Sequence, residues 1–388
     1  MRFPEFNGEW ITRPITDIAD FIGGGTPSSA NEAYWQGTIP WVSSSDIVED
    51  NINDITISRY ITEEAISNSA TKLCSAPVIL IVSRVGVGKV ALSSKAICTS
   101  QDFCNLINIK VHPTFLAYSL SQIMKRKSIE VQGTSIKGIT SLEIQKIILH
   151  IPSLQEQHKI SDLFQLIDKR IAVQSKIIEK YESLIQAIIY KAKIDGISKG
   201  TWRRIDLCKV LQERNEKNVN GRTICSVSVS QGVVNQIEYL GRSFAAKQTS
   251  HYNVVKYGDI VYTKSPTGDF PYGIIKRSNI REDVAVSPLY GVYIPVNDSM
   301  GVILHFYFMQ PSNAINYLHP LIQKGAKNTI NITNERFLEN SVPLPISESE
   351  ANTIAGILKT IQAKIEIEKS LLQSYIKEKE YLLRQMFI

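Results

Sequence analysis

IPSLQEQHKI, residues 151–160, opens the longest regular pattern in the sequence. Apolar residues continue from it at spacings of three and four or their sum, at Ile160, Phe164, Ile167, Ile171, Ile178, Tyr181, Ile185, Ile188 and Ala192. A seven-residue repeat kept over about four heptads favours the seam of a coiled coil. About forty helical residues would reach about 60 Å, because each residue adds about 1.5 Å. We therefore expect a long helix that acts as a spacer.

The same pattern returns near the end of the chain, where Leu344-Pro345 precedes a second apolar series. Its members are Ile354, Leu358, Ile361, Ile365, Leu372, Tyr375, Leu382 and Met386. One stripe position is polar in both copies, Gln174 and Glu368, and one differs, with Ile185 in the first copy and Lys379 in the second. The chain therefore contains an internal duplication, with one long helix in each copy.

Both helix starts carry the pattern Ser-x-x-Glu, with Ser153 and Glu156 in the first copy and Ser347 and Glu350 in the second. In a capping box the serine oxygen accepts a bond from an N–H of the first turn, and the glutamate accepts one from the serine's own N–H. We therefore expect a capping box at each helix start.

The bodies before the helices mix β-branched runs, such as Val78–Val82, with short helical stretches, such as Thr114–Lys127, which predicts an α+β chain. The predicted segments are residues 1–152, a first body; 153–195, a central helix; 196–345, a second body; and 346–388, a C-terminal helix. Gly196 and Gly200 are possible stops for the first helix. The alternative is that each helix packs on the core of its own domain.

The composition, with 43% hydrophobic and 21% charged residues, is that of a folded protein. The longest apolar run, Ala76–Val82, is too short to cross a bilayer, and the N-terminus lacks a signal-peptide core. We therefore expect a cytoplasmic protein without a membrane partner. The net charge of +6 is modest and does not by itself indicate nucleic-acid binding.

Motifs that would indicate an enzyme are incomplete. The run from Arg84 to Lys89 resembles a phosphate loop, but Ser83 stands at the position of the first glycine and Val90 at that of the metal-binding hydroxyl. The chain has no Pro-Pro pair of the adenine-methylation motif and no carboxylate followed two positions later by lysine, as restriction nucleases require. The glycines at 23–25 are expected to form a turn. We expect no catalytic residue, no bound cofactor and no metal site.

Polar loops are the remaining candidates for chemistry, because hydroxyls, amides and basic side chains can bind phosphates or read base edges. Two such loops occupy matching places upstream of the helix starts. The candidate DNA-binding residues are Ser43, Ser44, Ser45, Arg84, Lys89, Thr134, Ser135 and Lys137 in the first body, and Ser228, Lys264, Thr267, Lys327, Asn328 and Asn331 in the second. The alternative for each loop is a plain solvated surface.

Three stretches of the sequence resemble the specificity subunits of Type I restriction-modification systems. The first, residues 8–47, contains Gly-Glu-Trp, Gly-Gly-Gly-Thr-Pro-Ser and Ile-Pro-Trp-Val-Ser-Ser-Ser-Asp. Residues 151–160 are similar to the family's entry into its central helix, and residues 224–233 resemble a recurrent strand and turn. The second copy departs from the first at 343–351.

The resemblance implies two pseudo-symmetric α/β target-recognition domains, separated by two long antiparallel coiled-coil helices that act as a ruler. Each domain would read one part of an asymmetric, bipartite duplex DNA target. The helices would also dock two adenine-methyltransferase subunits, to which restriction-translocase subunits can be added. The chain itself would be no enzyme, since S-adenosylmethionine, ATP and Mg²⁺ would serve its partners.

A tandem coiled-coil scaffold or adaptor that reads no DNA is the rival interpretation, and a stand-alone nuclease is disfavoured by the missing carboxylate-lysine pattern. Co-expression with a methyltransferase subunit separates the specificity-subunit interpretation from the scaffold interpretation. Inserting four residues into the 160–192 helix should alter the spacing between half-sites if the ruler interpretation holds.

Overall fold

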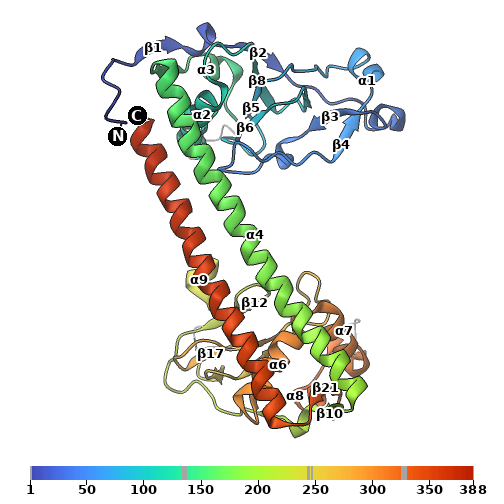
Figure 1. Cartoon of the computed structure of the whole chain (residues 1–388). Coiled ribbons are helices and arrows are strands. Elements are labelled where there is room, and N and C mark those ends of the chain that lie inside the picture. Colours follow the sequence, from blue (N-terminus) through green and yellow to red (C-terminus); the bar gives the residue numbers. More distant parts are fainter. Residues whose placement is uncertain (1, 133–137, 243–244, 246–247, 325–329, 388) are drawn as a thin grey trace. The chain divides into compact units, whose positions relative to one another are not determined.

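The structure is a computed structural model that describes residues 2–132, 138–242, 245, 248–324 and 330–387 (Figure 1). It forms two compact units. Unit 1 comprises Met1–Gln174 and Leu371–Ile388, and unit 2 comprises Ser175–Ser370. Two long helices, α4 (Leu154–Lys199) and α9 (Glu348–Met386), each contribute one part to each unit.

Unit 1 contains a four-stranded antiparallel sheet in the order β2-β8-β5-β6 and a three-stranded sheet in the order β4-β3-β7. Before α4, its elements are β1 (Ile11–Pro14), η1 (Ile15–Asp17), β2 (Asp20–Gly23), η2 (Glu32–Trp35), β3 (Ile39–Val42), η3 (Ser44–Asp46), β4 (Arg59–Ile61), α1 (Glu63–Ser67), β5 (Val78–Val82), β6 (Val90–Ser93), β7 (Cys98–Thr99), β8 (Phe103–Ile107), α2 (Pro113–Gln132), α3 (Ser141–Gln145) and β9 (Ile148–Ile151).

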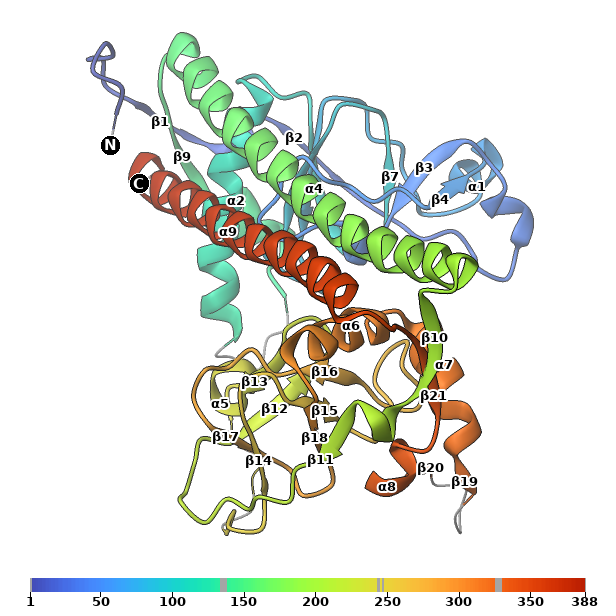
Figure 2. The same ribbon diagram turned by 60° about the horizontal axis from the view of Figure 1, so that its bottom comes forward.

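Unit 2 contains a four-stranded antiparallel sheet in the order β11-β18-β15-β16, with shorter strand pairs beside it (Figure 2). Between α4 and α9, its elements are β10 (Trp202–Asp206), η4 (Leu207–Lys209), β11 (Leu211–Glu213), β12 (Cys225–Ser228), β13 (Gly232–Asn235), α5 (Gln236–Leu240), β14 (Asn253–Val255), β15 (Ile260–Tyr262), β16 (Ile275–Arg277), β17 (Val284–Val286), β18 (Gly291–Pro295), α6 (Asp298–Phe308), α7 (Pro311–Leu318), η5 (His319–Leu321), β19 (Gln323–Lys324), β20 (Ile330–Asn331), α8 (Asn334–Phe337) and β21 (Ser341–Pro345).

The two units share one topology. In each four-stranded sheet, the strand that comes first in the chain (β2 or β11) pairs with the strand that comes last (β8 or β18). The other two strands follow beside the last one, in chain order. Helix α2 packs on this sheet in unit 1, and α6 packs on its counterpart in unit 2. An antiparallel ribbon leads into each long helix, β1 with β9 in unit 1 and β10 with β21 in unit 2. The predicted α+β class and the duplication are therefore confirmed, and the duplication extends through the bodies.

The apolar stripes of both long helices are buried or half-buried along their length. In unit 1, Phe164 of α4 packs with Phe387 in one hydrophobic core, their ring centroids 5.9 Å apart. The helix parts run antiparallel there, because Asp168 pairs with Lys379 while Arg170, further along α4, stacks over Tyr375, which lies earlier in α9. In unit 2, Lys369 of α9 pairs with Glu182 of α4 at 2.7 Å. None of the described helices combines the length and the apolarity needed to span a bilayer.

The predicted capping boxes are half right. At each helix start the serine oxygen accepts a backbone N–H, from Glu156 to Ser153 at 3.3 Å and from Glu350 to Ser347 at 3.4 Å. The predicted hydrogen bond from the serine N–H to the glutamate carboxylate is wrong. Both carboxylates instead accept hydrogen bonds from residues elsewhere in the chain.

The fully buried Glu156 forms two hydrogen bonds of 2.7 Å with the Arg2 guanidinium. Glu350 accepts a hydrogen bond of 2.8 Å from the indole Nε1 of Trp202. A charged or indole donor competes better for a carboxylate than the serine N–H. The two glutamates therefore tie the segment at the start of each copy to the start of its long helix.

Gly196 does not end the first helix, contrary to the prediction, whereas Gly200 does. A Cβ on Gly196 would lie 1.9 Å from Cδ1 of the buried Trp202, so this glycine lets the indole pack directly on the helix. Gly200 has a φ of +74° just after the last helical residue, the left-handed conformation that commonly ends helices.

Candidate nucleic-acid interface

Three segments that are distant in sequence meet at one place in unit 1. They are the serine loop (residues 43–47), the β5–β6 turn (residues 83–89) and the segment after residue 137 that leads to α3. Lys89 donates from Nζ to the carbonyl oxygen of Ile47 at 2.9 Å and more weakly to that of Ser44 at 3.4 Å. The backbone N–H of Ile139 donates to the carbonyl oxygen of Ser83 at 2.8 Å. The structure therefore gathers predicted loops into one cluster.

The serine loop is ordered by its own side chains. Ser43 and Asp46 form a capping box around η3, with the Ser43 backbone N–H 2.7 Å from Oδ2 of Asp46. The Ser43 hydroxyl also lies 2.8 Å from that of Ser45. Ser44 is buried and Ser45 is exposed. Among the three predicted serines, Ser45 is therefore the one whose hydroxyl faces solvent.

Arg59 joins this loop from the neighbouring strand, and sequence reasoning missed it. Its Nη2 donates to Oγ of Ser43 at 2.6 Å and forms an ion pair with Asp46. Its guanidinium carbon lies 4.5 Å from the ring centroid of Trp41. Strand pairing explains the stack, because Arg59 and Trp41 stand directly opposite each other in the β3–β4 register. A periodicity argument does not reveal this register.

The Trp41 ring is itself held in place. Its Nε1 donates to the carbonyl oxygen of Gly25 at 2.9 Å, and the ring packs edge-to-face on Trp35. A Cβ on Gly24 would lie 2.1 Å from the Ser100 carbonyl oxygen, and one on Gly25 would lie 2.4 Å from the backbone of residue 70. The predicted glycine turn is therefore wrong, since these glycines instead permit close backbone packing in an irregular segment after β2.

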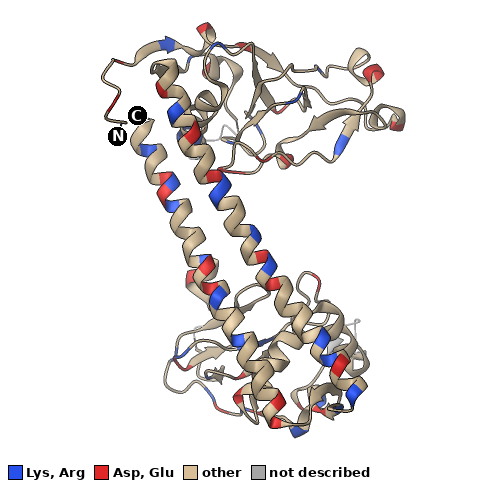
Figure 3. Cartoon of the chain, viewed as in Figure 1, with Lys and Arg blue, Asp and Glu red and all other residues tan. Residues whose placement is uncertain are grey.

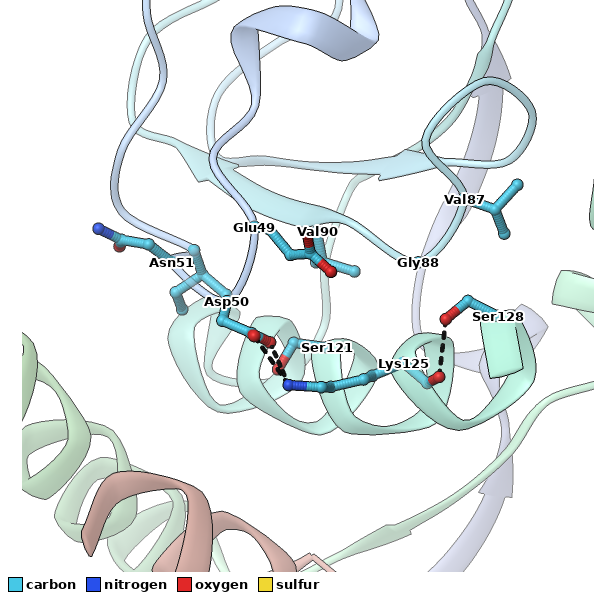
Figure 4. Close-up of a pocket in the computed structure, with 10 residues that line it drawn as sticks. Glu49, Asp50, Asn51, Val87, Gly88, Val90, Ser121, Lys125 and Ser128 are labelled. Atoms are coloured by element: carbon cyan, nitrogen blue, oxygen red, sulfur yellow. Dashed lines mark hydrogen bonds and ion pairs between the residues drawn. The ribbon is translucent and has the colours of Figure 1, made fainter. Parts of the chain in front are cut away.

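The β5–β6 turn uses glycine for its shape, with φ values of +82° at Gly86 and +104° at Gly88. Arg84 is exposed at its tip, and Lys89 is half-buried. Behind the turn lies a cavity of about 20 Å³, room for about one water molecule, between the turn, residues 49–52 and α2 (Figure 4). Lys125 closes it with an ion pair of 2.7 Å to Asp50. The cavity is too small for a substrate.

Unit 2 repeats the juxtaposition with other side chains. Lys264, in the β15–β16 turn (residues 263–274), donates from Nζ to Oδ1 of Asn334, just after the 330–333 segment. Asn334 in turn donates to Oε1 of Glu213 at 2.6 Å. Burial lowers the pKa of Lys264, and the nearby Glu213 opposes that shift. The turn after a central strand therefore meets the region of the last short helix in both units, at Ile139 just before α3 in unit 1 and at Asn334, the first residue of α8, in unit 2.

The other predicted residues of unit 2 are dispersed. Ser228 ends β12 and accepts or donates within a small hydroxyl cluster with Ser230 and Tyr239. Thr267 forms a tight turn with Phe270 through two backbone bonds of 3.0 Å. The backbone of Asn331 pairs with Gln323 in the β19–β20 ribbon. The predicted residues that lie outside the described part of the chain are Thr134, Ser135, Lys137, Lys327 and Asn328.

A basic cleft of about 330 Å³ lies between α2 and β9 in unit 1. Arg126, Lys127 and Lys146 line it together with the apolar rings of Trp10 and Phe387. None of the described residues that line it carries a carboxylate, and three carry a positive charge, which suits an anion such as a phosphate. The basic run at 125–127 was the sequence signal that could have indicated it.

Along α4 and α9, by contrast, basic and acidic residues are interspersed (Figure 3).

Within the described part of the chain, no group of three or more histidine, cysteine or acidic side chains is placed to hold a metal ion. What the loop clusters offer is hydrogen-bond donors on ordered backbone, presented at equivalent places of two sheets. Such an arrangement can recognise a polar, anionic surface.

Comparison with known proteins shows which proteins this chain is similar to. Residues 7–183 match the family model of the Type I restriction modification DNA specificity domain. The chain is 31% identical over 184 residues to the Type I restriction enzyme MjaIX specificity subunit of Methanocaldococcus jannaschii, which covers 44% of this chain and 41% of that protein. It is 28% identical over 210 residues to the EcoR124I/EcoR124II specificity subunit of Escherichia coli, with 48% and 50% covered. The matches span about half the length of these relatives or less.

Solved structures extend the likeness in fold to the whole chain. The S subunit of a Type I restriction-modification system from M. genitalium aligns with a TM-score of 0.62 over 100% of this chain and 97% of that chain, at 14% identity. A chain from a study of complex assembly and conformational transition in the Type I system aligns with a TM-score of 0.50, at 14% identity.

The family model therefore relates residues 7–183 to the DNA specificity domain of Type I restriction-modification systems. The chain is similar to the Type I specificity subunits over less than half of its length, and the solved structures add a likeness in fold alone.

Proposed function

We propose that this chain is the DNA-reading subunit of a Type I restriction-modification complex, and that each unit reads one half of an asymmetric, bipartite duplex target. Two readers on one spacer contact two sequences at a fixed separation, so docking geometry sets the distance between half-sites.

The observation that supports the proposal is that the two units share the strand order of their main sheet but differ in the polar residues of the loops at its end. The turn after a central strand lies against the segment before α3 in unit 1 and against the first residue of α8 in unit 2. In unit 1 this cluster carries the serine loop with Arg59, and in unit 2 it carries Lys264 and Asn334. Equal frameworks with different donors are what two readers of different sequences require. The basic cleft of unit 1 adds a place for phosphates.

The long helices would serve as the spacer and as the docking site for partner subunits. Leu166, Val173 and Leu184 of α4 are exposed to solvent, although a soluble helix usually turns such residues inward. Two adenine-methyltransferase subunits could cover such residues, and restriction-translocase subunits would complete the complex. The partners would use S-adenosylmethionine, ATP and Mg²⁺, and this chain would catalyse neither methylation nor cleavage.

The test is co-expression of the full chain with its methyltransferase subunit, followed by mapping of N6-methyladenine on plasmid DNA. We expect methylation confined to one asymmetric bipartite motif, and none when this chain is left out. If the joint complex forms but protects no sequence and methylates no adenine, the proposal is wrong and the scaffold interpretation stands.

A further inference from the structure

Arg59 is held in one orientation by three groups. The Trp41 ring lies beneath its guanidinium at 4.5 Å, Asp46 pairs with it, and Ser43 accepts from it at 2.6 Å. The Asp46 side chain is 12% exposed, whereas that of Arg59 is 38% exposed. The arginine is therefore anchored on its inner side and open on its outer side.

The anchoring leaves donors available. Both bonds to the serine loop use Nη2, so within the described part of the chain Nη1 and Nε have no hydrogen-bond partner. Ser45 is exposed in the same loop, and Lys89 ties that loop to the β5–β6 turn. An outward guanidinium on a rigid platform loses little side-chain entropy when it binds, which favours a directional contact.

The charge balance favours a base over a phosphate. Asp46 largely neutralises Arg59, and its carboxylate would also lie near any phosphate that the arginine approached. A base edge carries no net charge, so a neutralised arginine still donates to it without that repulsion. Guanine presents the acceptors O6 and N7 in the major groove, where arginine is a common partner, and the free Nη1 can donate to one of them while Nη2 stays bound to the serine loop.

We infer that Arg59 is a specificity-determining residue, which reads a guanine in the half-sequence contacted by unit 1, with Asp46, Ser43 and Trp41 as positioning residues. This inference rests on the proposed function. It also assigns base readout to the β3–β4 strand pair.

The experiment maps N6-methyladenine in a plasmid library with randomised half-sites, using the full chain co-expressed with its methyltransferase subunit. Wild-type protein should require guanine at one position or more of the half-sequence read by unit 1. Arg59→Ala should lower that preference roughly tenfold at one such position, and leave the other half-sequence unchanged. Asp46→Asn, which frees the guanidinium, should weaken the same preference less.

Arg59→Lys keeps the charge and can still pair with Asp46, but it lacks the planar guanidinium, so it should also relax the guanine preference even if the alanine variant folds poorly. Arg13→Ala, a charge loss at an exposed site on β1, should leave the motif unchanged. An unaltered motif in both Arg59 variants, or a uniform loss at all sequences, would overturn the inference. Absence of any motif in the wild type would instead refute the proposed function.

Discussion

Lys379 interrupts the apolar stripe of α9 and is nevertheless buried. Its ammonium lies 2.6 Å from Oδ1 of Asp168 on α4 and donates to the carbonyl oxygen of Asp50 at 2.9 Å. Tyr118 and Asn53 donate to the other oxygen of Asp168 at 2.6 and 2.8 Å. Burial and the Asp168 charge raise the pKa of Tyr118, so it remains a donor. Lys379 is therefore the ionic partner of Asp168 and contacts the oxygen that Tyr118 and Asn53 do not.

Removing that lysine should be costly. Lys379→Ala leaves the half-buried Asp168 carboxylate without its ionic partner, so we expect a loss of about 3 kcal/mol in the free energy of unfolding. The control is Lys369→Ala on the same helix, whose ion pair with Glu182 is about half exposed and worth below about 1 kcal/mol. Urea unfolding measures both. Equal, small losses in the two variants would show that the buried pair has no special weight.

His305 provides a pH prediction for unit 2. Burial, with the positive charges of Lys276 and Arg277, lowers its pKa to about 3, and its Nδ1 accepts the Arg277 backbone N–H at 3.1 Å. The folded state therefore favours the neutral ring. The stability that this provides is complete above the unfolded pKa near 6.5 and is lost as the pH falls from there toward 3.

We expect the free-energy difference between wild type and His305→Asn to shrink by on the order of 2 kcal/mol between pH 7.5 and 5.0, because asparagine does not titrate and each pH unit below the unfolded pKa costs about 1.4 kcal/mol. Denaturant unfolding at the two pH values measures it. A difference that does not change with pH would mean that the buried ring is free to take up a proton in the folded state.

At this scale the sequence predicted which loops are polar but not which partners their side chains have. Ser44 and Lys89 were proposed separately for DNA contacts, and they contact each other within the loop cluster. Arg59 was missed because its significance comes from standing opposite Trp41. Cross-strand register depends on tertiary pairing, and local composition does not encode it.

At the scale of elements, the spacing of apolar residues predicted both long helices, and the serines predicted where they begin. The glycines were harder to interpret. Gly196 was expected to be a stop, but it is a contact site inside a helix, because Trp202 occupies the space where a Cβ would stand. A glycine's role depends on its neighbours in space, so its position in the pattern was insufficient.

Two glycine substitutions in the long helices should have opposite signs. Gly196→Ala drives a Cβ into the buried Trp202 ring, and overpacking of this kind costs about 1–3 kcal/mol. Gly356→Ala, in α9 with nothing within 4 Å of its Cβ position, should gain up to about 1 kcal/mol through reduced backbone entropy. Thermal unfolding of the two variants compares them directly. Stabilisation by Gly196→Ala would contradict the close packing of Trp202.

At the scale of the whole molecule, the duplication in the helices predicted two related bodies. Their common strand order could not be predicted, because short β-branched runs do not specify which strands are neighbours. The order β2-β8-β5-β6 recurs as β11-β18-β15-β16, while the loops at the sheet ends differ in their donors. The proposed function uses this combination, and it requires the helices to set the distance between the two readers.

The most direct test lengthens both helices together, by four residues after Gln174 in α4 and four after Ser370 in α9. Four residues advance a helix by about 6 Å and slightly more than one turn, close to two base-pair steps of about 3.4 Å. Methylation mapping of the co-expressed complex should find both half-sequences unchanged and the spacer between them longer by about two base pairs. An active complex that keeps the original spacer would contradict the ruler on which the account depends.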